Sequence, residues 1–138
     1  AEALRWYRKA AEQGYAEAQF NLGAMYATGR GVRQDYTEAG KWFRQAAEQG
    51  YAEAQYNLGA MYATGYGVSQ NDAEAIRWYR QAAEQGYAAA QYNLGAMYFT
   101  GRGVRQDLHL GKEWFGKACD GGVQVGCDLY RYLNQKGY

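Results

Sequence analysis

Apolar residues recur along the chain at helical spacing in two alternating patterns. In the first pattern, seen in residues 52–64, Ala54, Leu58, Met61 and Tyr62 occupy positions i, i+4, i+7 and i+8. This spacing places them on one face of an α-helix. We term a helix of this pattern an NLG helix, after its Asn-Leu-Gly sequence.

The second pattern lies in residues 35–49 and also predicts an amphipathic helix. Its apolar stripe comprises Ala39, Trp42, Phe43, Ala46 and Ala47. We term it a WFR helix. Asp35 and Glu38 have the spacing of an N-cap residue and its capping-box partner, so the helix is expected to begin at Asp35.

The two patterns alternate with a period of 36 residues, and residues 35–70 match residues 71–106 at 26 of 36 positions. Neither helix can bury its stripe alone, so successive pairs are expected to stack. The expected organisation is a single array over 1–138, with a WFR helix at 1–14, repeats at 15–50, 51–86 and 87–122, and a C-terminal capping helix at 123–138.

Glycine recurs in the middle of the NLG helices, at Gly23, Gly59 and Gly95. Glycine inside a helix costs about 1 kcal/mol relative to alanine. A cost repeated in three units predicts a compensating close approach to a neighbouring WFR helix, with Ala39, Ala46 and Ala47 facing the gap. Other glycines, such as Gly50 and Gly65, follow helix ends, where a left-handed residue is expected.

The pattern A-x-x-x-L-G-x-x-Y-x-x-G-x-G-V followed by E-A-x-x-W-[FY]-x-x-A-A-x-x-G resembles the Sel-one-like repeat (SLR) family, a relative of the tetratricopeptide repeat. The resemblance covers nearly the whole chain. It implies an all-α fold, a right-handed α/α solenoid of antiparallel helix pairs with about eight helices. It also implies a scaffold that binds a protein or peptide partner.

The two ends of the chain depart from the repeat. Arg131 replaces the mid-helix glycine in the last segment, which predicts a capping helix with a more polar outer face. The first WFR helix has no preceding NLG helix, so Trp6 and Ala10 are expected to be partly exposed to solvent. This predicts end-to-end self-association. Because the chain starts inside a repeat, we expect a fragment or a processed form.

The charge balance excludes some classes of partner. The chain has 15 basic and 14 acidic residues, which gives no attraction to nucleic acid or to an anionic membrane. No apolar run approaches the roughly 20 residues that span a bilayer, so no membrane insertion is expected.

Cys119 and Cys127 are the two cysteines, and they align with Ala47 and Gln55 across the turn between a WFR helix and an NLG helix. Residues beside such a turn lie close together, so a disulfide fits, and so do two free thiols. The SLR resemblance favours the disulfide, because cysteine-rich members join each repeat at this spacing. An oxidised pair implies a periplasmic or secreted protein, and free thiols imply a cytoplasmic one.

The inventory of reactive residues does not support catalysis. His109 is the one histidine, and no nucleophile with an adjacent base has supporting spacing. We therefore expect no enzyme, no cofactor and no metal site. The repeated carboxylates are expected on the helix surface, with Arg44 paired to Glu48 at helical spacing.

By similarity to tetratricopeptide repeats, the NLG helices are expected to line a concave binding face. Phe20, Tyr56 and Tyr92 would form an aromatic row along it, and Asn21, Asn57 and Asn93 a second row at its edge. The remaining predicted contacts are Glu53, Phe99 and Tyr132.

Two interpretations of these rows stay open. In one, the asparagines hold a ligand main chain and the aromatic rings stack on its side chains. In the other, each asparagine ties down a neighbouring loop and each ring packs between helices. Position 63 varies as Ala27, Ala63 and Phe99, which favours a ligand. A cell-wall sugar or β-lactam-type ligand, or a designed or duplicated structural array, are the alternatives to a protein partner.

Overall fold

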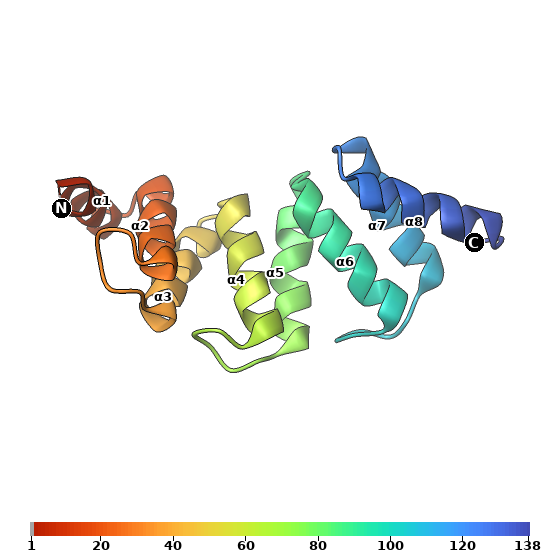
Figure 1. The fold of residues 1–138 in the computed structure, drawn as a ribbon, viewed down its shortest axis with the longest axis horizontal. Coiled ribbons are helices and arrows are strands. Elements are labelled where there is room, and N and C mark those ends of the chain that lie inside the picture. Colours follow the sequence, from red (N-terminus) through yellow and green to blue (C-terminus); the bar gives the residue numbers. More distant parts are fainter. Residues whose placement is uncertain (1) are drawn as a thin grey trace. The chain divides into compact units, whose positions relative to one another are not determined.

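A computed structural model describes residues 2–138 as α-helices joined by loops (Figure 1). Within these residues there are eight helices and no strand, which confirms the predicted all-α class. The helices are α1 Glu2–Glu12, α2 Ala16–Thr28, α3 Tyr36–Glu48, α4 Ala52–Thr64, α5 Asp72–Glu84, α6 Ala88–Thr100, α7 Leu108–Asp120 and α8 Gln124–Gln135.

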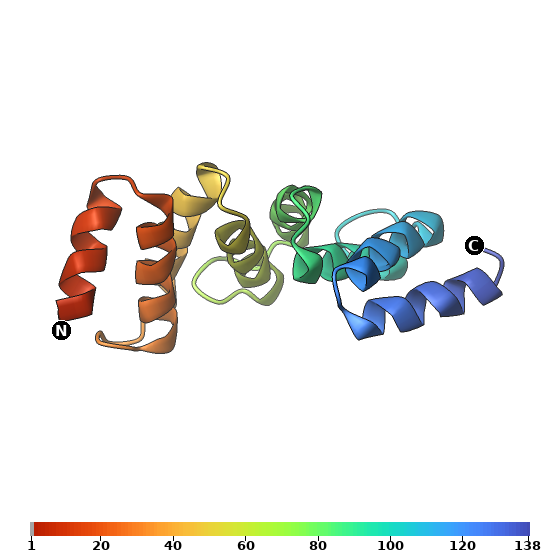
Figure 2. The same cartoon turned by 90° about the horizontal axis from the view of Figure 1, so that it is seen from above.

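The chain divides into two compact units, the first ending at Asn71 and the second running from Asp72 to Tyr138. In the first unit α1 packs on α2, α2 on α3 and α3 on α4. In the second unit the same order holds for α5 to α8. Consecutive helices of one unit, such as α1 and α2, lie side by side in Figure 2.

Short turns join each WFR helix to the NLG helix that follows. Between α3 and α4 the turn is residues 49–51, with Gly50 at φ 93° in the left-handed region, as predicted. The connection from an NLG helix to the next WFR helix is longer. The first such connection ends at Asp35, whose carboxylate accepts a hydrogen bond of 3.0 Å from the main-chain N–H of Glu38, which confirms the predicted N-cap.

Two of the mid-helix glycines, Gly23 and Gly95, make the close approach that was predicted, but chiefly to an aromatic ring. A Cβ atom at Gly23 would lie 2.8 Å from Cδ1 of Phe43 and 3.2 Å from the carbonyl oxygen of Ala39. Gly95 meets Phe115 in the same way, at 2.9 Å. The aromatic residue of the WFR helix therefore occupies the space that the missing methyl group leaves.

A buried glutamine near the start of each inner NLG helix was not predicted. Gln55 donates a hydrogen bond of 3.1 Å to the carbonyl oxygen of Ala47, eight residues earlier in the preceding helix. Gln19 bonds to Ala11 in the same way, at 3.2 Å. A buried amide with this partner holds the two helices of the pair together at their turn.

The last helix pair has a disulfide at the same spacing. Cys119 of α7 and Cys127 of α8 are bonded, with their Cα atoms 4.6 Å apart. This agrees with the disulfide that the SLR resemblance favoured over two free thiols.

The predicted ion pair between Arg44 and Glu48 is wrong. The Arg44 guanidinium instead donates a hydrogen bond to the hydroxyl of Tyr62 and lies 5.6 Å from the centre of its ring. The side chain thus joins α3 to α4 rather than extending along α3. Arg80 and Tyr98 make the same pair in the second unit.

The first and last helices expose side chains at positions that are less exposed in the helices between them. The side chain of Trp6 in α1 is 67% exposed, as predicted. Arg131 in α8 is exposed and lies 3.7 Å from Asp128, whereas Gly95 at the corresponding position of α6 is buried. Among the helices of residues 2–138, none has the length and apolarity needed to cross a membrane.

Candidate functional site

A hollow of about 310 Å³ lies between two NLG helices of the first unit. We term it the α2–α4 hollow, because most of its lining residues come from these two helices. Phe43 of α3, the ring that packs on Gly23, forms part of its wall. The lining residues are Ala24, Ala27, Thr28, Tyr36, Phe43, Asn57, Ala60, Met61, Thr64 and Tyr66.

Tyr36 and Tyr66 line the hollow and stack on each other, with ring centroids 5.4 Å apart and planes at 18°. Both remain substantially exposed, at 40% and 59%. Gln34 fixes this pair by donating hydrogen bonds to the hydroxyl of Tyr36, at 3.2 Å, and to the carbonyl oxygen of Ala27, at 2.8 Å. Gly67 lets the loop approach, because a Cβ atom there would overlap the main chain of Tyr36.

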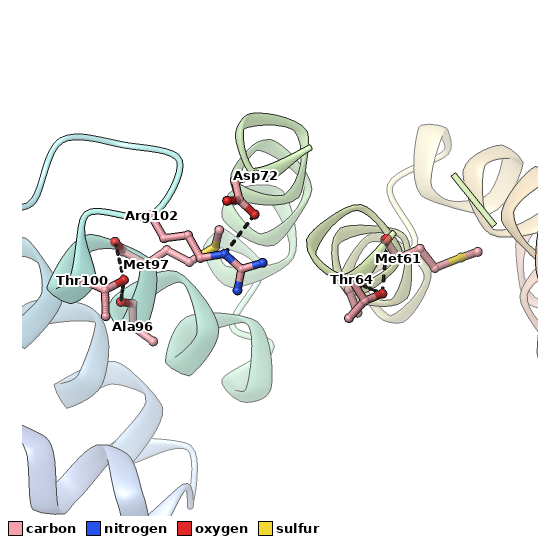
Figure 3. Close-up of polar contacts among 8 residues, drawn as sticks. Met61, Thr64, Asp72, Ala96, Met97, Thr100 and Arg102 are labelled. Carbon is pink, nitrogen blue, oxygen red and sulfur yellow. Dashed lines mark hydrogen bonds and ion pairs between the residues drawn. The ribbon is translucent and has the colours of Figure 1, made fainter. Parts of the chain in front are cut away.

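The second unit makes the corresponding contact with different chemistry. Nε of Arg102 lies 2.9 Å from Oδ1 of Asp72, and these residues hold the positions of Tyr66 and Tyr36 one repeat later (Figure 3). The same two positions of the repeat therefore form an aromatic stack in the first unit and an ion pair in the second. Sequence reasoning missed Tyr36.

Asn57 presents the one side-chain amide in the lining of the hollow. It is half-buried, and within residues 2–138 it has no side-chain hydrogen bond. The hydroxyl groups of Thr28 and Thr64 are committed to their own helices, through bonds to the carbonyl oxygens of Ala24, at 2.8 Å, and Ala60, at 2.9 Å. Figure 3 shows the bond from Thr64 to Met61, and the Thr100 bonds in α6 repeat this arrangement.

The other two asparagines of the predicted row share this state. Asn21 and Asn93 are half-buried, and neither forms a side-chain hydrogen bond in the described part of the chain. The interpretation in which each asparagine ties down a loop therefore has no hydrogen bond to support it. The amides remain available to a ligand.

A second hollow, of about 320 Å³, lies one repeat earlier in the chain, and several of its lining residues are equivalent to those of the first. It contains Asn21, with Tyr7 in place of Phe43 and Arg30 in place of Tyr66. Its other lining residues are Ala3, Ala24, Met25 and Thr28. An asparagine beside small residues thus recurs once per repeat within the first unit.

The predicted aromatic row has packing partners inside the protein. Phe20 lies 5.6 Å from Phe43 and 5.4 Å from Tyr51, between ring centroids. Tyr92 lies 5.7 Å from Phe115 in the second unit. Both are half-buried, as is Tyr56, so their rings contribute to the core as well as to any ligand surface.

The three remaining predicted residues differ in their surroundings. The ring of Phe99 packs on Phe115, with centroids 6.0 Å apart. Tyr132 is 49% exposed, with the ammonium of Lys136 5.7 Å from its ring centre. Glu53 is exposed and close to Tyr51, where burial first, then Glu53 and Glu17, raise the pKa of the Tyr51 hydroxyl.

The groups gathered at the hollows provide hydrogen bonding and apolar contact. Across residues 2–138 no three His, Cys, Asp or Glu side chains converge as a metal site would require. His109 packs edge-on against Tyr138, with ring centroids 5.4 Å apart. The α2–α4 hollow fits binding of an uncharged group, because none of its lining residues is charged.

Comparison with known proteins shows which family has this architecture. A structure of a protective antigen from uropathogenic Escherichia coli strains, displaying an SLR fold, superposes with a TM-score of 0.93 and 44% identity, covering 96% of this chain and 28% of that one. A Sel1 repeat protein from Oxalobacter formigenes superposes with a TM-score of 0.86 and 39% identity, covering 95% and 98% of the two chains. Helicobacter pylori cysteine rich protein B shares the fold, with a TM-score of 0.73 and 22% identity over 93% and 92%.

No curated protein sequence matches the chain. The sequence model of the Sel1 repeat matches residues 1–15, 16–51, 52–87 and 88–123, one residue after the predicted repeat boundaries. The match covers nearly all of the chain, which therefore belongs to the Sel1 repeat family.

Proposed function

We propose that this protein is a scaffold that binds an extended segment of a protein partner along its NLG helices. Sel1 repeats generally act in protein interaction, and binding along these helices is the specific claim. The observation that carries it is the half-buried amide of Asn57, which faces an apolar hollow and has no hydrogen-bond partner in the described chain. Asparagine is a poor helix former, so its recurrence at this position has a cost that a bound main chain would offset.

An asparagine amide suits this task because it offers both a donor and an acceptor. A peptide main chain needs the same two groups for each residue that leaves water. We propose that Asn21, Asn57 and Asn93 bind the main chain, with Phe20, Tyr56, Tyr92, Glu53, Phe99 and Tyr132 beside it. The Cys119–Cys127 disulfide supports a place of action in an oxidising compartment, periplasmic or extracellular.

Affinity selection from a library of displayed random peptides tests the proposal. Peptides selected on the native protein should lose most of their binding to the Asn57→Ala variant, and Tyr56→Ala should weaken it less. Glu48→Ala, an exposed change in α3 away from the hollow, serves as the matched control. If an N-acetylglucosamine tetramer binds, depends on Tyr56 and ignores Asn57→Ala, the ligand is a cell-wall sugar and the peptide proposal is wrong.

A further inference from the structure

We propose that the α2–α4 hollow is the subsite that takes one uncharged apolar side chain of the bound peptide. We further propose that Phe99 fills the corresponding place in the second unit. This inference rests on the proposed function, because it names the group that the scaffold would hold. It adds that the first unit has an open subsite, whereas Phe99 closes the corresponding subsite of the second unit.

The chemistry of the lining selects the occupant. No residue around the hollow is charged, so a charged group entering it would lose hydration without gaining a partner. The threonine hydroxyls bond to their own helices and the Tyr36 hydroxyl bonds to Gln34. Asn57 offers the one side-chain amide of the lining, and it is uncommitted among alanines and aromatic rings. An apolar side chain with its own main-chain amide beside it complements both parts.

The second unit provides an internal comparison two repeats later. Phe99 stands at the position of Ala27, and its ring lies 6.0 Å from Phe115, which stands at the position of Phe43. Because Ala27 and Phe43 both line the hollow, the Phe99 ring occupies the corresponding space.

Five other lining positions also change, and two of them concern the space and the amide of the hollow. Tyr132 stands at the position of Ala60, and Leu129 at the position of Asn57. The second unit therefore loses the free amide at the same site where it loses the two small residues. The first unit thus has both the small residues that leave space and the free asparagine amide, and the corresponding site of the second unit has neither. A subsite that holds an apolar side chain together with its main chain needs both features.

The test is an NMR titration. Capped single amino acids are added to the isotope-labelled native protein, and the chemical shifts of its main-chain amides are measured. N-acetyl-phenylalaninamide and N-acetyl-leucinamide should shift the resonances of Ala24, Asn57 and Ala60. N-acetyl-lysinamide should leave these resonances in place. Shifts of equal size with the lysine compound, or no shifts with any compound, would overturn the proposal.

Two variants copy the filling residues of the second unit into the first. Ala27→Phe and Ala60→Tyr should each abolish the shifts, and either one suffices if the other fails to fold. Glu48→Phe adds a ring to the exposed surface of α3 and should leave the shifts unchanged. Persistent shifts in a folded Ala27→Phe or Ala60→Tyr variant would show that the compounds bind elsewhere.

The outcome is separable from that of the proposed function. If the selected peptides depend on Asn57 but still bind Ala27→Phe at full strength, the scaffold function stands and the subsite proposal is wrong. If the capped amino acids bind as expected but no peptide is selected, the hollow takes apolar groups and the scaffold function is wrong.

Discussion

The side-chain amide of Gln91 donates a hydrogen bond of 3.1 Å to the carbonyl oxygen of Ala83. One repeat later, Cys119 and Cys127 occupy these two positions and form a disulfide. A buried hydrogen bond and a covalent bond therefore join the two helices of a pair at the same place in successive repeats.

This equivalence predicts that a glutamine can replace part of the disulfide. The double variant Cys119→Ala, Cys127→Ala should lose about 2.5 kcal/mol of unfolding free energy, the chain-entropy value for a loop of this size. The double variant Cys119→Ala, Cys127→Gln recreates the Ala83–Gln91 pair and should recover about 1 kcal/mol of that loss. Urea unfolding of the oxidised protein and both variants measures the difference. Equal stabilities of the two variants would contradict the equivalence.

Gly23→Ala is expected to destabilise the protein by about 1–2 kcal/mol, although alanine is the better helix former. The added methyl group would lie 2.8 Å from the Phe43 ring, which is itself buried. Phe43→Leu should reduce the penalty of Gly23→Ala when the two changes are combined, because the smaller side chain leaves room. A double-mutant cycle by urea unfolding measures this coupling. Additive effects would show that the ring is not the obstacle.

Asn57→Ala is expected to stabilise the protein by up to about 0.7 kcal/mol, because alanine is the better helix former and no internal hydrogen bond is lost. Gln55→Ala is the control in the same helix. Its amide bonds to Ala47, so that variant should lose at least about 1 kcal/mol. Thermal and urea unfolding give the sign of each change. A loss of stability in Asn57→Ala would restore the loop-tying interpretation.

The exposed Trp6 predicts self-association of the protein through α1, as an outcome still to be measured. Sedimentation equilibrium should give an average mass that rises with concentration, and Trp6→Glu should abolish the rise. Tyr66→Glu changes another exposed aromatic residue, 59% exposed, and should leave the association unchanged. A monomeric mass at high concentration would contradict the prediction.

Tyr51 should make the protein less stable at alkaline pH. Its hydroxyl has a pKa raised above the ordinary value of 10.0 in the folded state, by burial first and then by Glu53 and Glu17. The unfolded chain loses this proton at lower pH, so the stabilising contribution is complete below about pH 10 and is lost as the pH rises through the folded pKa. Urea unfolding from pH 8 to 11 should show a smaller alkaline loss for Tyr51→Phe than for the native protein. Parallel curves would contradict the shift.

The sequence predicted the helices well because their signals are local. The stripe that contains Phe43 repeats at helical spacing, and the Asp35 cap depends on a residue three positions away. The contact between Tyr36 and Tyr66 depends on residues in one helix and in a loop thirty residues later, so no local pattern could reveal it. Arg44 also had two partners within reach, and the crossing of α3 with α4 decided between Glu48 and Tyr62.

The aromatic positions show a further limit of sequence reasoning. Phe20 and Tyr92 were assigned to the ligand surface by similarity to tetratricopeptide repeats, and they recur once per repeat. Residues that pack between neighbouring repeats recur in the same way, and both rings contact core phenylalanines. The period of the sequence therefore cannot distinguish a residue that binds a ligand from one that packs between repeats. The absence of a hydrogen bond at the Asn57 amide likewise becomes visible only in the structure.

The contacts of Tyr36 with Tyr66 and of Asp72 with Arg102 each join the first residue of a helix to the loop that follows the next helix. Removing residues 37–72 would leave Tyr36 thirty positions before Arg102 and so pair an aromatic ring with a guanidinium. Removing residues 67–102, a deletion of equal length, would keep Tyr36 with Tyr66 and discard both members of the ion pair. Unequal recombination within such a gene would therefore yield matched neighbours from some crossover points and mismatched ones from others.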